Sequence, residues 1–158
     1  MMNSVWAATA ELPRREPLRG DTGTDVLIIG GGLAGLLCAY RLQQAGVSCL
    51  LAEAETICSG VTRNTTAKIT SQHGLIYSEL IRRFGTERAQ MYLNANESAL
   101  QEYRTLCADI DCDFEEKDSF VYSLSGREKI EQELDALEKL EISLGLNAGH
   151  SRAVNLKT

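Results

Sequence analysis

The sequence predicts an α/β fold that opens with a strand–helix–strand unit, and three observations support this prediction. The run VLII after Asp25 is apolar without alternation, which is typical of a strand buried on both faces. A glycine-rich turn follows, and apolar side chains then recur at helical spacing between Leu33 and Ala45. Gly46 ends this helix, and the run VSCLLAE predicts a second buried strand.

The elements expected next are a loop, two helices and a strand. Residues 54–72 are polar and rich in threonine and serine, which predicts a long functional loop. A short helix over Tyr77–Phe84 is expected to end at Gly85, and Thr86 opens a longer helix. The segment Ser119–Leu124 alternates like a strand. The apolar face predicted for the longer helix consists of Ala89, Tyr92, Ala95, Ala99, Tyr103 and Leu106.

A capping box predicts the start of a last helix, because Ser125 and Glu128 have the spacing at which each side chain reaches the other's backbone N–H. Gly145 is its expected end. We expect its apolar face to pack on elements that this chain lacks. That face consists of Ile130, Leu134, Leu137, Leu140 and Leu144.

The composition restricts the class of protein. With 44% hydrophobic and 24% charged residues over 158 positions, the chain is typical of a globular protein. Its net charge of -6 argues against binding nucleic acid or an anionic membrane through a general positive field. No secretory signal or bilayer-spanning run is visible, so a cytoplasmic protein is predicted. The five cysteines have no CxxC spacing, which predicts reduced thiols and no metal site.

Gly30, Gly32 and Gly35 form a G-x-G-x-x-G pattern at the turn between the first strand and the helix. Gly30 permits the tight turn, Gly32 lets the backbone approach a diphosphate, and Gly35 lets the helix pack closely on the strands. The amides at the helix start, including those of Leu33 and Ala34, then face the anion together with the helix dipole. This context predicts a Rossmann-like dinucleotide site; the alternative is an ordinary glycine-rich turn.

Glu53 stands at the end of the second strand, about 20 residues after the glycines. From this position a carboxylate accepts hydrogen bonds from both hydroxyls of an adenosine ribose. Its charge would repel a 2′-phosphate, which disfavours NADP. Because the spacing does not separate FAD from NAD, a small NAD-binding module is one alternative.

The stretch DVLIIGGGLAGLLCAYRLQQAGVSCLLAEAE, followed by GVTRNTTAKITSQHG, resembles the amino-terminal part of FAD-dependent oxidoreductases of the D-amino-acid oxidase and glycine oxidase type. The segment TTAKITSQHG and the upstream SVW resemble a bacterial branch whose members often carry a carboxy-terminal Rieske domain. The resemblance covers roughly residues 4–147. It implies FAD as the cofactor, with the ADP half on the strand–helix–strand unit. It also implies an amine or amino acid as the small-molecule substrate, oxidised by hydride transfer to the flavin.

The resemblance also implies cofactor contacts in the loop GVTRNTT, which matches the family segment that passes the pyrophosphate toward the flavin. Arg63, Asn64, Thr65 and Thr66 are the candidates, because hydroxyl, amide and guanidinium groups bond phosphate and ring heteroatoms. The alternative is that Arg63 and Lys68 are ordinary solvated side chains.

The sequence departs from the family pattern in two respects. Ala54 stands where many relatives place a basic or polar residue that touches the adenosine. Relatives are also well over twice as long, and their second FAD segment and most of their substrate pocket have no counterpart here. We therefore expect a truncated chain with a partial α+β substrate-domain segment, exposed apolar surface and weak FAD retention. Such a chain would need a complementing partner or would self-associate through an exposed sheet edge. The alternative function is a catalytically inactive dinucleotide-binding fragment.

Several other residues are candidates for chemistry. His73 is a candidate proton donor or flavin contact, with a packing role as the alternative. Tyr77, Tyr92 and Tyr103 are predicted to be core residues, and the acidic run over residues 109–116 is predicted to be a solvated turn. No catalytic side chain is assigned, because in this flavin class the protein mostly supplies position and electrostatics.

These patterns predict four regions. They are an extended arm over residues 1–22, an FAD-binding unit with its flavin loop over 23–72, a helical segment with the start of a substrate domain over 73–147, and a tail without secondary structure over 148–158. Trp6, which stands alone in the polar arm, is expected to pack back on the domain.

Overall fold

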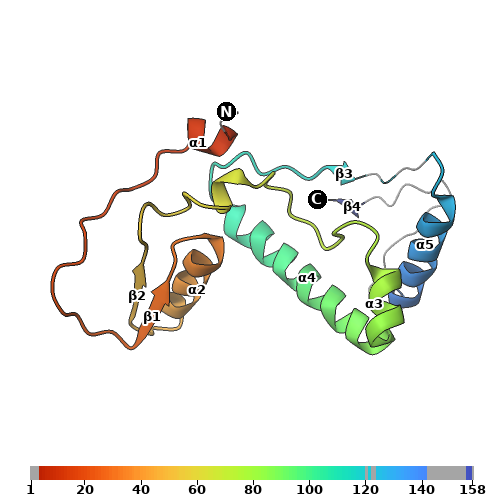
Figure 1. Ribbon diagram of the computed structural model, residues 1–158, viewed down its shortest axis with the longest axis horizontal. Coiled ribbons are helices and arrows are strands. Elements are labelled where there is room, and N and C mark those ends of the chain that lie inside the picture. The colour runs from red at the N-terminus through yellow and green to blue at the C-terminus, as the bar shows by residue number, and fades with distance from the viewer. Residues whose placement is uncertain (1–3, 120, 122–123, 142–155, 158) are drawn as a thin grey trace. The chain divides into compact units, whose positions relative to one another are not determined.

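The computed structural model describes residues 4–119, 121, 124–141 and 156–157 (Figure 1). The chain divides into two compact units, Met1–Ala67 (unit 1) and Lys68–Thr158 (unit 2). Unit 1 contains the predicted strand–helix–strand segment, and unit 2 contains the helices expected after residue 76.

Unit 1 is a small mixed α/β unit built around two parallel strands. Strand β1 (Val26–Ile29) pairs with β2 (Cys49–Ala52) along its whole length, from Val26 opposite Cys49 to Ile29 opposite Ala52. Helix α2 (Leu33–Gln44) connects the strands and lies against both of them (Figure 1). Gly46 follows the helix with φ of +72°, a conformation that favours glycine, as its predicted role requires.

Two short elements lie in segments predicted to be irregular. The arm contains helix α1 (Val5–Thr9), and the loop after β2 contains the 3₁₀ turn η1 (Thr62–Asn64). Both are too short to show a hydrophobic period, so the sequence pattern does not reveal them.

Strand β1 is not buried on both faces, and that prediction was wrong. Its residues alternate between half-buried and exposed, with Leu27 54% and Ile29 85% exposed. Strand β2 is half-buried throughout. Among residues 4–67 Gly31 alone is buried, because a two-stranded sheet carrying one helix leaves part of its apolar surface uncovered. The expected exposed apolar surface is thus confirmed.

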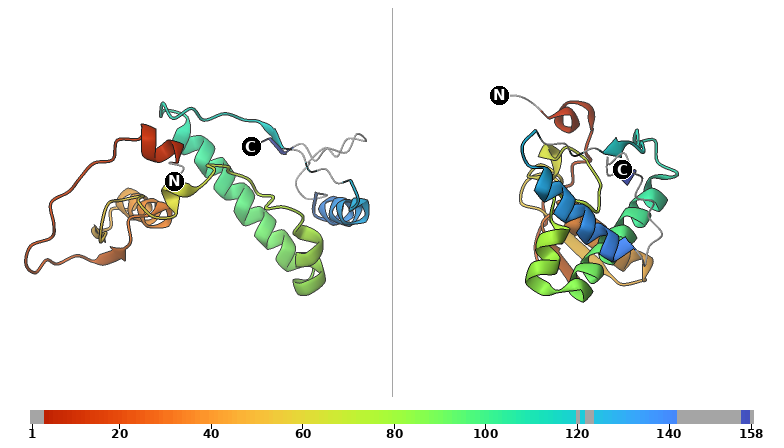
Figure 2. Two further views of the ribbon diagram at one scale, coloured as in Figure 1. Left: turned by 45° about the horizontal axis from the view of Figure 1, so that its top comes forward. Right: turned by 90° about the vertical axis from the view of Figure 1, so that its right-hand side faces the viewer.

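Unit 2 is a helical cluster of α3 (Tyr77–Phe84), α4 (Thr86–Cys107) and α5 (Arg127–Glu141). Gly85, with φ of +83°, separates α3 from α4 as predicted. Helix α5 lies against both α3 and α4 (Figure 2). In the part of the chain that the structure describes, no helix combines the length and apolar character that a membrane span requires.

The core of unit 2 joins all three helices. Leu137 and Leu140 are buried on the predicted face of α5, while Leu144 and Gly145 lie outside the described residues. This face packs on α3 and α4, which corrects the expectation that it would pack on elements the chain lacks. The buried cluster consists of Tyr77, Ala89, Leu93, Ala136, Leu137 and Leu140.

The buried face of α4 differs from the predicted one. Its buried residues are Ala89, Leu93 and Leu100, whereas Tyr92 is 38% exposed. Ala95 and Ala99 are exposed as well. Because leucine buries more apolar area than alanine does, the packing of α4 on α3 and α5 is more stable when the face that contains Leu93 and Leu100 is turned inward.

Three further predictions changed in unit 2. Of the strand expected over Ser119–Leu124, only Ser119 lies in a strand, β3 (Asp118–Ser119); Val121 and Leu124 lie outside it, and the remaining positions fall outside the described residues. β3 pairs in antiparallel fashion with β4 (Leu156–Lys157), which corrects the prediction of a tail without secondary structure. Helix α5 begins at Arg127, so Gly126 rather than Ser125 directly precedes it.

Candidate functional site

The glycine turn joins the end of β1 to the start of α2. Gly30 has φ of +105°, and its N–H donates to the Ala52 carbonyl at 2.8 Å. A Cβ added at Gly35 would stand 2.0 Å from the Gly30 carbonyl oxygen. The chain thus turns tightly at Gly30, and α2 packs directly on the strand end at Gly35, as the spacing predicted.

The start of α2 offers backbone donors. Gly32 precedes the helix without a side-chain cap, and a Cβ added there would meet only the Thr62 hydroxyl, at 3.4 Å. The Leu33 N–H donates to the same hydroxyl at 3.0 Å. The N–H groups of Gly32 and Ala34 have no hydrogen-bond partner among the described residues. Unpaired amides at a helix N-terminus favour an anion.

Glu53 follows β2, and its carboxylate is held by two backbone amides. Gly31 donates to Oε2 at 2.7 Å, and Glu55 donates to Oε1 at 3.0 Å. The Gly31 amide first, and the Glu55 amide second, hold the pKa of this carboxyl below its ordinary value. Each oxygen of an ionised carboxylate accepts more than one hydrogen bond, so both retain capacity for a hydroxyl donor.

The loop after β2 is attached to the glycine turn at three points. Besides the Glu53 contact, Cys58 donates its N–H to the Gly31 carbonyl at 2.8 Å, and Thr62 accepts from Leu33. The loop GVTRNTT contains Thr62, but the sequence analysis did not name this residue among the cofactor-contact candidates. It also did not foresee the contact between the Gly31 N–H and Glu53.

Two of the predicted loop residues use their side chains within the loop. The Asn64 amide donates to the Gly60 carbonyl at 3.1 Å, and the Thr65 hydroxyl donates to the Thr62 carbonyl at 3.1 Å. These bonds hold the turn η1, so both side chains shape the loop in this structure.

The arm contacts the same loop. Ser4 donates its hydroxyl to the Arg63 carbonyl, and the Trp6 indole N–H donates to the Thr65 carbonyl at 2.9 Å. Trp6 therefore packs back, as predicted. The Arg63 and Thr66 side chains are exposed and have no hydrogen bond or ion pair among the described residues.

The candidates in unit 2 have structural surroundings. His73 is exposed, with Nε2 3.4 Å from Asn96 Oδ1. Tyr77 is fully buried and donates its hydroxyl to the Ser71 carbonyl at 2.6 Å, and burial raises its pKa. The core prediction is confirmed for Tyr77, whereas Tyr103 is half-buried and Tyr92 is exposed.

The acidic run over residues 109–116 lies in an irregular segment whose carboxylates are exposed, as predicted. Glu116 pairs with Arg104 at 2.7 Å and Glu115 pairs with Lys117 at 2.6 Å. Across the described ranges, no three His, Cys, Asp or Glu side chains are placed to hold a metal ion.

Comparison with known proteins shows the family of the chain. The family model described as "FAD dependent oxidoreductase" matches residues 25–154. The "Putative Rieske 2Fe-2S iron-sulfur protein YhfW" of Bacillus subtilis is 39% identical over 90% of this chain and 29% of its own length. One of the subunits of the anaerobic glycerol-3-phosphate dehydrogenase of Haemophilus influenzae is 33% identical over 78% of this chain and 24% of its own length. The chain thus spans less than a third of these relatives. No solved structure matches it.

Proposed function

The chain belongs to the FAD-dependent oxidoreductase family, whose cofactor is FAD, and on that premise we propose that unit 1 binds the ADP half of FAD in a Rossmann-like manner. One observation carries this proposal. The Glu53 carboxylate is held beside the glycine turn by the Gly31 amide, at the ends of two parallel strands. Parallel α/β sheets bind their ligands outside these strand ends.

The residues of the turn fit the cofactor. The amides of Gly32, Leu33 and Ala34 would hold the diphosphate, with the Thr62 hydroxyl giving up its bond to Leu33. Glu53 would accept the ribose hydroxyls while its bonds to Gly31 and Glu55 keep it ionised. Arg63, with an exposed and unpaired guanidinium among the described residues, would offset the diphosphate charge. Asn64, Thr65 and Thr66 are proposed to position the loop that leads toward the flavin.

We propose that the whole oxidoreductase acts on an amine or an amino acid. When bound, FAD supplies a hydride acceptor, and the protein supplies orientation and the exclusion of water. The family match and the likeness to the D-amino-acid oxidase type support this substrate class. The five free cysteines support a reducing compartment such as the cytoplasm.

A second candidate is a dinucleotide-binding fragment that is inactive until a partner chain, or a second copy, adds to its sheet. The exposed apolar face of β1, with Leu27 and Ile29, supports this alternative. The two candidates share the FAD site and differ in whether this chain alone reduces its flavin.

The test uses Trp6, the single tryptophan of the chain, which is bonded to the loop that carries the site. FAD, NADH and ADP are titrated while Trp6 fluorescence is measured, and calorimetry gives the stoichiometry. Saturable 1:1 binding of FAD, tighter than that of NADH and weakened about fivefold to tenfold in Glu53→Gln, is the expected result. Tighter binding of NADH, or no FAD binding, would contradict the proposal. Bleaching of bound flavin by anaerobic addition of amino acids or amines distinguishes the first candidate from the second.

A further inference from the structure

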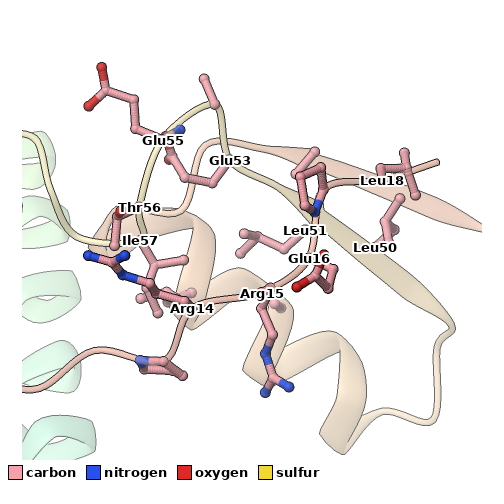
Figure 3. Close-up of a pocket in the computed structure, with 16 residues that line it drawn as sticks. Arg14, Arg15, Glu16, Leu18, Leu50, Leu51, Glu53, Glu55, Thr56 and Ile57 are labelled. Atoms are coloured by element: carbon pink, nitrogen blue, oxygen red, sulfur yellow. The ribbon is translucent and has the colours of Figure 1, made fainter.

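Unit 1 contains a groove between the arm and β2 (Figure 3). Its walls are residues 13–18 of the arm, residues 50–57 of β2 and the following loop, and Leu36 and Ala39 of α2. Its volume is about 890 Å³, within the range of roughly 300–1,000 Å³ typical of small-molecule sites. The groove therefore has room for a nucleoside beside Glu53, which is one of its lining residues.

Two arginines line this groove from the arm. Arg14 and Arg15 are exposed, and neither has an ion pair or hydrogen bond among the described residues. The Arg14 guanidinium lies beside Thr56 and Ile57, whereas the Arg15 side chain extends away from these residues (Figure 3). The neighbouring arginines thus differ in the part of the groove that they reach.

The loop beside Arg14 begins at Glu53. A ribose held by the Glu53 carboxylate would carry its base along residues 54–57, where Ala54 and Ile57 offer apolar surface. Ala54 has no polar side chain with which to hold a base. The loop therefore supplies one wall for a flat ring, and a planar group from the arm can supply the other.

We propose that Arg14 stacks its guanidinium on the adenine of FAD, so that the arm forms the outer wall of the adenosine site through this side chain. This inference rests on the proposed function, since it takes Glu53 to hold the ribose. The contact depends on the planar shape of the guanidinium rather than on the charge of the groove. Glu16 and Glu55 also line the groove, and their negative charges offset those of the two arginines. The diphosphate is assigned to the glycine turn instead.

The test compares FAD and AMP affinities of the wild type with those of three variants, by Trp6 fluorescence and calorimetry. Arg14→Ala is expected to bind both ligands about tenfold more weakly. Arg14→Lys keeps the charge but not the planar group, and is expected to lose as much. Arg15→Ala removes the same charge from the adjacent position and is expected to remain within about twofold of the wild type. Far-UV circular dichroism checks that the exposed substitutions leave the fold intact.

The outcomes separate the two proposals. A wild type that binds no FAD overturns the proposed function and, with it, this inference. A wild type that binds FAD while Arg14→Ala binds equally well, or while Arg14→Lys retains full affinity, overturns the stacking contact alone. Trypsin gives a second readout: bound FAD should slow cleavage after Arg14 and Arg15 in the wild type, and equal cleavage with and without FAD would contradict the arm's role as a wall.

Discussion

Alanine substitutions at Gly32 and Gly35 are expected to affect different properties: the first weakens FAD binding with little change in stability, and the second destabilises the fold. At Gly32 the new Cβ meets only the Thr62 hydroxyl, at 3.4 Å, and φ is -79°. The free energy of unfolding should therefore change by less than about 1 kcal/mol. At Gly35 the new Cβ falls 2.0 Å from the Gly30 carbonyl oxygen, so α2 must withdraw by about 1 Å. Overpacking of this kind costs about 1–3 kcal/mol, a large loss for a unit with almost no buried side chain.

The expected loss of FAD affinity in Gly32→Ala follows from the same contact. The Thr62 hydroxyl, which the new methyl group approaches, is also the acceptor of the Leu33 N–H. The methyl group thus enters the space into which this amide points. Losing one or two charge-assisted hydrogen bonds to the diphosphate, each worth about 1.5–3 kcal/mol, weakens binding at least tenfold.

Two measurements check this pair of variants: FAD titration by Trp6 fluorescence, and urea unfolding followed by circular dichroism. Unchanged FAD affinity in Gly32→Ala would show that no anion approaches the turn. An unchanged urea midpoint in Gly35→Ala would show that α2 does not rest on the strand end at this position.

Three further predictions concern carboxylates. Arg82 and Arg83 hold the pKa of Glu79 at about 2, below its ordinary 4.5, so the stability that this carboxylate contributes is present above about pH 4.5 and lost as the pH falls toward 2. The urea midpoint should therefore drop less in Glu79→Gln than in the wild type between about pH 5 and pH 3, and added salt should shrink the difference. Glu133 is 1% exposed and accepts from two amides of the first turn of α3, at 2.8 and 2.9 Å. Glu133→Ala should lower the free energy of unfolding of unit 2 by about 2–3 kcal/mol, and Glu133→Gln, which keeps one acceptor oxygen, should lower it by less. Equal urea midpoints for the alanine variant and the wild type would show that Glu133 does not cap the start of α3. For Glu53→Gln, the weaker FAD binding should persist at pH 5, because the Gly31 amide keeps the wild-type carboxylate ionised there; convergence of the two affinities at that pH would contradict this.

The glycine turn could be predicted from the sequence because the conformation of its backbone depends on neighbouring residues in the chain. A positive φ at Gly30 and a close approach at Gly35 depend on residues within one turn of chain. The same holds for the break between α3 and α4, which is set by the positive φ of Gly85. Local backbone requirements select glycine whatever the rest of the fold does.

Burial could not be predicted in the same way, because it depends on what packs against an element. The run VLII is typical of a strand covered on both faces, yet Ile29 is 85% exposed. Ala95 and Ala99 of α4 fit a helical stripe, yet they are exposed, and Leu93 and Leu100 are buried together with Ala89. The role of Thr62 was missed for a related reason: its partner is the Leu33 amide, 29 positions earlier in the chain, and no periodic pattern marks such a pair.

The bonds that assemble the proposed FAD site are also the bonds that attach its loop to the rest of unit 1. The Gly31 N–H to Glu53, the Cys58 N–H to the Gly31 carbonyl and the Leu33 N–H to Thr62 join the loop to the glycine turn, in a unit whose described side chains are all at least partly exposed. With so little buried apolar surface, each of these bonds is a larger share of the stability than it would be around a core. A ligand that binds only the folded unit adds about 2.7 kcal/mol when its concentration is a hundred times its dissociation constant. Folding of the loop and binding of FAD are therefore expected to be coupled. A variant such as Glu53→Gln then loses apparent affinity for two reasons: it loses the ribose contact, and a smaller fraction of the protein has the folded loop. The urea midpoint measured without FAD gives the loss that comes from the smaller folded fraction, and only the rest of the affinity loss belongs to the ribose contact.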